Sequence, residues 1–174
     1  MSLSGDALKS LALQASLSPQ EEMLETSQKN QNLYIGIPKE TELQEQRVAL
    51  VPESVSLLVA NGHRVVVETG AGENANFSDS DYSESGAEII YDTKQLYKAD
   101  IILKVSPPND KEIALMKHKQ ILFSALQITA QPQNALKKLM AKKITAIAWD
   151  YIEDKSGSFP LVRSMGEIAG TSSF

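Results

Sequence analysis

The stretch that decides the fold is DIILKVSPPNDKEIALMKHKQILFSALQ, residues 100–127. Its two ends, 100–105 and 120–126, are short and almost continuously apolar, which is typical of strands that are buried on both faces of a parallel sheet. Between them lies a helical candidate near 109–118. The stretch therefore predicts a strand–helix–strand unit, in which the two strands run parallel.

The same alternation continues on both sides of this unit. Further strands are expected at 33–38, 64–69, 87–90 and 143–149, and further helices near 52–61, 79–85, 93–98 and 132–142. We therefore predict an α/β fold: a parallel, doubly wound sheet of the Rossmann or flavodoxin type, with helices on both faces. Leucines and methionines among polar residues predict an N-terminal helical extension over 1–31.

Composition narrows the classes of function. The chain has 174 residues, 42% of them hydrophobic, which is enough for one ordinary core. A net charge of -5 without a basic block argues against nucleic acid or an anionic membrane as partner. The absence of cysteine excludes disulfides and thiolate sites, and no spacing suggests a metal site. With neither an apolar run of about 20 residues nor a signal peptide, a cytoplasmic location is expected.

Two cations follow predicted strands, at the edge where doubly wound sheets bind ligands. Arg47 lies in a polar loop after the first strand, directly before apolar Val48. It is either part of a solvated surface loop or a guanidinium aimed into the cleft, where it would suit a carboxylate. Lys104 closes the strand at 100–105. It either extends to solvent or points into the crevice and polarises a carbonyl group.

A glycine motif invites a different interpretation. Gly70 and Gly72 begin a G-x-G-x-x-A match after a predicted strand, and Asp92 follows where a dinucleotide fingerprint has its acid. That fingerprint needs a helix opening on the pyrophosphate, whereas the residues after Gly72 stay polar and rich in Ser and Asp. We therefore interpret the motif as a turn without a nucleotide role. His63 and His118 lie away from the strands' carboxyl ends and give no catalytic arrangement.

Taken together, several segments resemble one family. They are GIPKETELQEQRVALVPESVSLLVANGH, VVVETGAGENANFSDSDY, ADIILKV, ILFSALQ, KITAIAWDYI and PLVRSMGEIAG, in this order from about residue 33 to residue 170. They resemble the N-terminal domain shared by alanine dehydrogenase and the alpha subunit of pyridine nucleotide transhydrogenase. The residues DKSGSFPLVRSM place the chain nearer to alanine dehydrogenase.

The resemblance implies a substrate-side domain at 32–163, and at 164–174 the start of a truncated linker helix toward a missing NAD-binding domain. NAD would be bound mainly by that absent domain, and the 174-residue chain would be inactive alone. The reaction implied is the reversible oxidative deamination of L-alanine to pyruvate and ammonia. Arg47 would bind the carboxylate of this small 2-oxo acid or amino acid, Lys104 would bond its keto or amino group, and Met165 would line the pocket. A homo-oligomer is also implied.

Gln127 departs from the family pattern. It stands where typical alanine dehydrogenases have a catalytic histidine, and a carboxamide can bond a substrate but cannot exchange a proton. Three interpretations are open: transhydrogenase-like hydride transfer, which needs no proton shuttle here; an alanine dehydrogenase-like branch with another donor or substrate, for which Arg163 is an unusual extra cation; or lost activity. The alternative from another class is a non-catalytic ligand-binding or assembly module.

Overall fold

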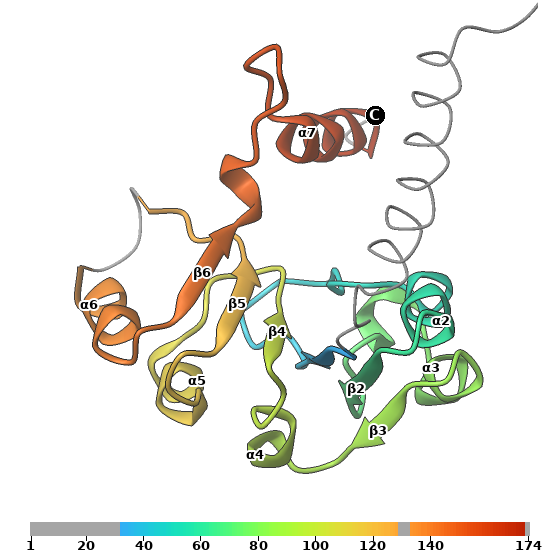
Figure 1. Cartoon of the computed structure of the whole chain (residues 1–174). Coiled ribbons are helices and arrows are strands. Elements are labelled where there is room, and N and C mark those ends of the chain that lie inside the picture. Colours follow the sequence, from blue (N-terminus) through green and yellow to red (C-terminus); the bar gives the residue numbers. More distant parts are fainter. Residues whose placement is uncertain (1–31, 129–132, 173–174) are drawn as a thin grey trace, which may run out of the picture. The chain divides into compact units, whose positions relative to one another are not determined.

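The computed structural model describes residues 32–128 and 133–172, so the predicted N-terminal extension lies outside the described residues. The described part contains one six-stranded sheet in the order β3-β2-β1-β4-β5-β6 (Figure 1). All of its strand pairs are parallel. The strands are β1 (Tyr34–Ile37), β2 (Arg64–Glu68), β3 (Glu88–Ile90), β4 (Ile101–Leu103), β5 (Ile121–Ser124) and β6 (Thr145–Ala148). The predicted fold class is confirmed.

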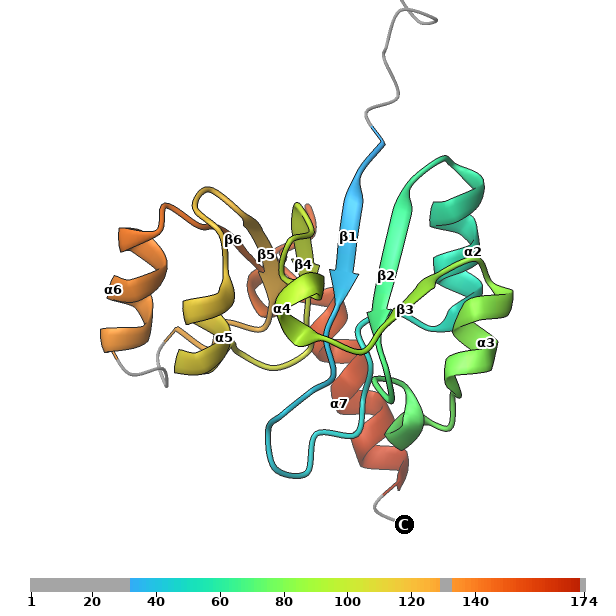
Figure 2. The same ribbon diagram turned by 90° about the horizontal axis from the view of Figure 1, so that it is seen from below.

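Helices cover both faces of this sheet. They are α2 (Pro52–Ala60), α3 (Asp79–Glu84), α4 (Thr93–Leu96), α5 (Asp110–Leu115) and α6 (Gln133–Ala141). A further helix, α7 (Pro160–Ser172), follows β6. Figure 2 shows α2 and α3 on one face, and α4, α5 and α6 on the other. The pattern in β2 explains this division, because successive side chains of a strand point to opposite faces. Val65 and Val67 pack with the α2 and α3 side, and Val66 packs with the α4 to α6 side.

The order of the strands creates a switch point between β1 and β4. These neighbours pair in parallel, with Ile35 opposite Ile101. The chain after β1 runs to α2 on one face, whereas the chain after β4 runs to α5 on the other face. The two connections therefore diverge at the carboxyl ends of the strands, where open α/β sheets leave a crevice for ligands.

The glycines after β2 are explained by packing. Gly70 has a φ of 71°, a conformation that glycine adopts without strain. A Cβ atom added to Gly72 would lie 2.6 Å from Cε2 of Tyr82 and 2.8 Å from the carbonyl oxygen of Phe77. A short 3-10 helix, η1 (Glu73–Ala75), follows. Because α3 begins only at Asp79, the turn lacks the helix that a dinucleotide fingerprint requires.

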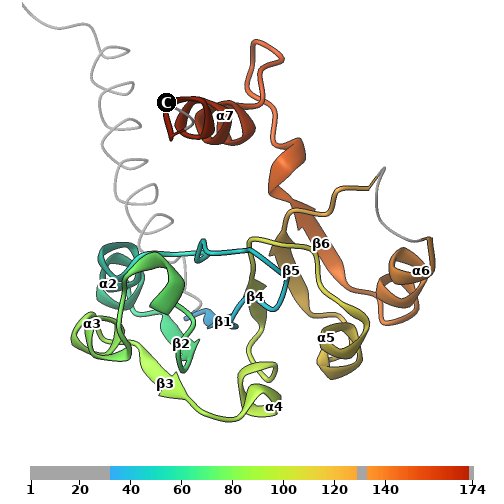
Figure 3. The same cartoon turned by 180° about the vertical axis from the view of Figure 1, so that it is seen from behind.

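Helix α7 stands apart from the other helices. The chain leaves β6 through a 3-10 turn, η2 (Trp149–Tyr151), and Figure 3 shows α7 beyond the carboxyl end of β6. The helix begins at Pro160, before the Ser164 at which the predicted linker helix would start. Because of this placement, α7 lies over the carboxyl ends of the strands, on the side of the sheet where the switch point opens.

Candidate functional site

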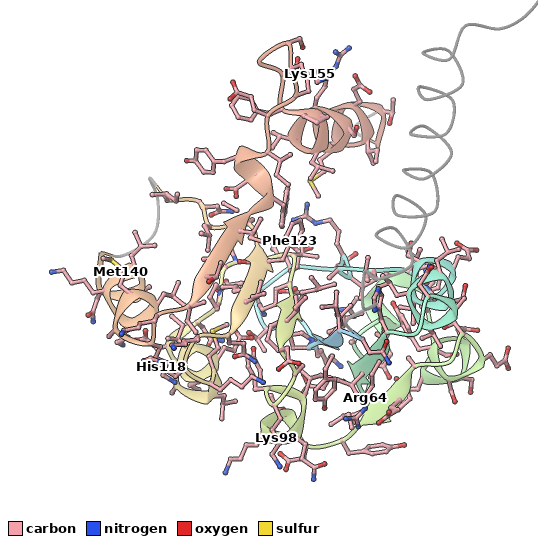
Figure 4. All side chains as sticks on the ribbon, in the orientation of Figure 1. Arg64, Lys98, His118, Phe123, Met140 and Lys155 are labelled. Carbon is pink, nitrogen blue, oxygen red and sulfur yellow. The ribbon has the colours of Figure 1, made fainter. Side chains whose placement is uncertain are left out.

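A cavity of about 410 Å³ lies between α7 and the carboxyl ends of β4 and β5. Three of the sequence-predicted site residues line it: Arg47 from the loop after β1, Lys104 after β4, and Met165 from α7. Most of its remaining wall is apolar, and the largest side chains there are Leu50, Leu103, Phe123, Trp149, Leu161 and Ile168. Figure 4 labels Phe123, near the carboxyl end of β5. We call this space the Arg47 cavity.

Arg47 is held between a carboxylate and a thioether. Its Nε donates to Oε1 of Glu45 at 2.7 Å, and its Nη2 donates to Oε2 of Glu45 at 2.6 Å. Its Nη1 lies 3.3 Å from Sδ of Met165. Hydrogen bonds from Arg47 lower the pKa of Glu45 to about 2, and the bond to Glu45 raises the pKa of Arg47. Both partners are therefore charged at neutral pH.

Lys104 lies in a buried ion cluster. Its Nζ is 2.8 Å from Oε1 of Glu112 and 3.3 Å from Oε2 of Glu40. The side chains of Lys104, Glu40 and Glu112 are 1%, 5% and 8% exposed. The interpretation that Lys104 extends to solvent is therefore wrong. Its ammonium group is bound to carboxylates in this arrangement, although the residue also borders the Arg47 cavity.

The ion cluster also fixes the loop after β1 to the end of β4. Oε1 of Glu40 accepts from the backbone N–H of Val105 at 2.6 Å. Glu112 accepts from the hydroxyl of Thr41 at 3.3 Å and from the N–H of Asn109 at 2.8 Å. These bonds satisfy both buried carboxylates, which would otherwise be costly to desolvate. They hold in place the loop that carries Arg47.

Gln127 lies outside the Arg47 cavity. It lines a neighbouring polar pocket of about 320 Å³ together with Glu42, Gln44, Glu45 and Ser106. Its backbone has a φ of 43°, and its N–H donates to Oδ2 of Asp150 at 2.9 Å. The structure therefore brings Arg47, Lys104 and Met165 together, whereas Gln127 lines the polar pocket that Glu45 also lines.

Sequence reasoning missed Glu45, Ser106 and Trp149 as parts of this region. Glu45 connects the two pockets, because it lines the polar pocket and binds the guanidinium that borders the Arg47 cavity. The sequence did contain a signal for Glu45: it lies two residues before Arg47, and a carboxylate beside a cation can pair with it. Trp149 gave no such signal; its indole N–H donates to the carbonyl of Val105 at 3.2 Å.

No cluster of three or more metal-ligating side chains occurs among residues 32–128 and 133–172. The glycine turn after β2 does not fit a dinucleotide, because it is not followed by a helix that opens on it. Among the described helices, none has the length and apolar character needed to cross a bilayer. The site is therefore best described as an apolar cavity with one accessible arginine.

Comparisons with known proteins point to one family. The family model for the alanine dehydrogenase/PNT N-terminal domain matches residues 36–169. An alanine dehydrogenase of Bacillus subtilis is 42% identical over 138 residues, which cover 79% of this chain and 36% of that protein. An alanine dehydrogenase of Methanococcus maripaludis is 41% identical over 139 residues, covering 79% of this chain and 37% of that protein.

Two solved structures extend the comparison. An L-alanine dehydrogenase superposes with a TM-score of 0.75 at 40% identity, covering 78% of this chain and 37% of that one. A transhydrogenase from Sinorhizobium meliloti superposes with a TM-score of 0.63 at 30% identity, covering 67% and 33%. This chain spans little more than a third of the length of the curated relatives. It belongs to the family of alanine dehydrogenase and transhydrogenase N-terminal domains.

Proposed function

We propose that this domain binds the carboxylate of a small 2-oxo acid or amino acid and is the substrate side of an alanine dehydrogenase-like, NAD-dependent oxidoreductase. The reaction would be the reversible oxidative deamination of L-alanine to pyruvate and ammonia. One observation carries the proposal: Arg47 and Met165, far apart in the sequence, meet at 3.3 Å on the wall of one cavity. The similarity to alanine dehydrogenases at 42% and 41% identity supports the choice of substrate.

The chemistry of the cavity suits a short carboxylate. An arginine is permanently charged and presents planar N–H groups that match a carboxylate. The apolar side chains around it would accept a methyl group and exclude water, which strengthens the ionic contact. A volume of about 410 Å³ exceeds that of pyruvate, so the cavity can also admit a second reactant. NAD would be bound mainly by a separate domain, as the family resemblance implies.

Lys104 and Gln127 would have different roles in the proposed reaction. The predicted bond from Lys104 to a keto or amino group requires the ammonium to turn from Glu112 toward the cavity. Gln127 cannot exchange a proton, so the proton steps of deamination would need another group. A transhydrogenase-like hydride transfer, which requires no such group here, is therefore the second candidate, and the similarity to the S. meliloti protein at 30% identity favours it.

The test is ligand binding to the 174-residue chain. Pyruvate, L-alanine and the neutral analogue pyruvamide would be titrated by NMR chemical shifts. A hydrogen bond to a charged group is worth about 1.5–3 kcal/mol, so Arg47→Ala should weaken pyruvate binding roughly 10- to 150-fold. Pyruvamide binding should change little. Arg47→Lys should be intermediate, because it keeps the charge and loses the planar fork.

Arg64 provides the matched control. Its side chain is 53% exposed, like that of Arg47, and it also binds a glutamate through Nε and Nη2, here Glu88 at 2.7 Å. It lies at the start of β2, away from the Arg47 cavity (Figure 4). Arg64→Ala should leave pyruvate affinity unchanged. Equal pyruvate affinity in the wild type and Arg47→Ala would overturn the proposal.

A further inference from the structure

We infer that Glu45 is a positioning residue that orients Arg47 for a carboxylate ligand. By holding one edge of the guanidinium group, Glu45 turns the opposite edge toward the Arg47 cavity. The inference rests on the proposed function, since it concerns how the same site binds its ligand. It assigns a role to a residue that does not line the cavity itself.

The hydrogen bonds show which edge is taken. Glu45 occupies the edge formed by Nε and Nη2 with both of its oxygens, at 2.7 and 2.6 Å. Nη1, which Glu45 does not bind, points toward Sδ of Met165 at 3.3 Å, and Met165 lines the cavity. Because a guanidinium has five N–H groups in a fixed plane, the edge formed by Nη1 and Nη2 stays available to a ligand. Arg47 can thus bind Glu45 and a ligand together.

Glu45 is itself held firmly. Its side chain is 10% exposed, whereas that of Arg47 is 53% exposed. Oε2 accepts from the hydroxyl of Ser106 at 3.1 Å, and Oε1 accepts from the backbone N–H of Arg47 at 3.0 Å. The preceding residue, Gln44, has a φ of 71°, which is costly for a residue with a side chain. A strained turn and several anchors therefore fix the carboxylate that orients the guanidinium.

Two physical effects of Glu45 on a ligand have opposite signs. Its negative charge repels an incoming carboxylate, so removing the charge alone would strengthen binding. Its hydrogen bonds with Arg47 fix the long, flexible arginine side chain before the ligand binds, so removing these bonds would weaken binding. The direction of the change in affinity thus separates positioning from competition. A charge effect also weakens in salt, because the Debye length shrinks to about 3 Å at 1 M.

The experiment compares Glu45→Ala with Glu42→Ala in the 174-residue chain, by NMR titration with pyruvate and pyruvamide. Glu42 lines the same polar pocket, so its substitution removes the same charge without touching the guanidinium. We expect Glu45→Ala to weaken pyruvate binding about tenfold at high salt, because an unfixed arginine must be ordered on binding. The loss should be smaller at low salt, where the removed repulsion offsets part of it. Pyruvamide affinity should stay within about twofold, since a neutral ligand depends little on the charged fork.

The conservative variant tests the mechanism further. Glu45→Gln keeps the length of the side chain and one acceptor oxygen. Its amide NH2 group is a donor, so it cannot accept the second hydrogen bond from Arg47. It should recover part of the affinity lost in Glu45→Ala, and it carries the test if Glu45→Ala fails to fold in a thermal melt. A purely structural role would instead weaken pyruvate and pyruvamide equally.

The outcomes also separate this inference from the proposed function. If Arg47→Ala binds pyruvate as well as the wild type does, the proposed function fails. If Arg47→Ala loses pyruvate while Glu45→Ala behaves like Glu42→Ala, only the role of Glu45 is overturned. Tighter pyruvate binding by Glu45→Ala would likewise overturn it, because Glu45 would then be a competitor of the ligand.

Discussion

Replacing Lys104 by methionine tests whether the buried ion cluster contributes to stability. The substitution keeps an unbranched side chain of similar length at a position that is 1% exposed, and removes the charge that faces Glu40 and Glu112. Removing one partner of a buried ion pair costs about 3–5 kcal/mol, because the remaining charge is left uncompensated. We therefore expect Lys104→Met to be strongly destabilising.

The structure places the cost near the lower end of that range. After the substitution, Glu40 keeps the N–H of Val105 at 2.6 Å, and Glu112 keeps the N–H of Asn109 at 2.8 Å. These backbone donors continue to stabilise the carboxylates, so we expect a loss of about 3 kcal/mol in the free energy of unfolding. For a domain of this size the loss corresponds to a fall in Tm of roughly 6–12 °C.

The assay is urea unfolding of the 174-residue chain, with Lys138→Met as the matched control. Lys138 pairs with Asp110 at 2.8 Å, but the two side chains are 41% and 65% exposed. An exposed pair contributes about 0–1 kcal/mol, so the control should unfold nearly like the wild type. Adding Glu112→Gln to Lys104→Met should recover part of the stability, since one unpaired charge disappears. A loss below about 1 kcal/mol in Lys104→Met would refute the reasoning.

Two further changes concern stability alone. Val51 is the N-cap residue of α2, and its side chain makes no capping bond. Val51→Thr should therefore raise the free energy of unfolding by about 1 kcal/mol in urea unfolding, whereas Val51→Ala should not. Equal stability of the two variants would contradict the capping argument. The hydroxyl of Tyr97 is buried and has no hydrogen-bond partner within the described part of the chain. Tyr97→Phe should consequently leave stability unchanged or raise it by up to about 1 kcal/mol in the same assay. A clear loss would show that the hydroxyl is bonded after all.

The sheet could be predicted because buried parallel strands leave a local signal. Runs such as residues 100–105 and 120–126 are apolar on both faces, and that pattern alone separates them from amphipathic helices. The order of the strands leaves no such signal, since it depends on which helices cover which face. The meeting of Arg47 with Met165 followed from the family resemblance, and nothing in the local pattern around either residue indicated it.

The environment of Lys104 could not be predicted for a related reason. Its partners Glu40 and Glu112 come from a loop and a helix on different sides of β4 in the sequence. Such pairs have no periodicity, and a single sequence shows only that the three charges exist. Gln127 was singled out because the family resemblance puts a catalytic histidine at its position. The positive φ of Gln127 and the bond from its N–H to Asp150 belong to a turn that the sequence pattern did not indicate.

The contact between Arg47 and Met165 has a consequence for the assembly of the domain. Because β1 and β6 are already joined through the sheet, the segment that this contact orders runs from Ala148, at the end of β6, to Met165. Ordering that segment costs conformational entropy that one weak contact cannot repay. A ligand that binds only when both residues are in place adds RT ln(1 + [L]/Kd) to the closed form, about 2.7 kcal/mol at a concentration of 100 Kd. A ligand of this kind would then stabilise the packing of α7 against the sheet, and its concentration would set the fraction of molecules in which α7 is packed.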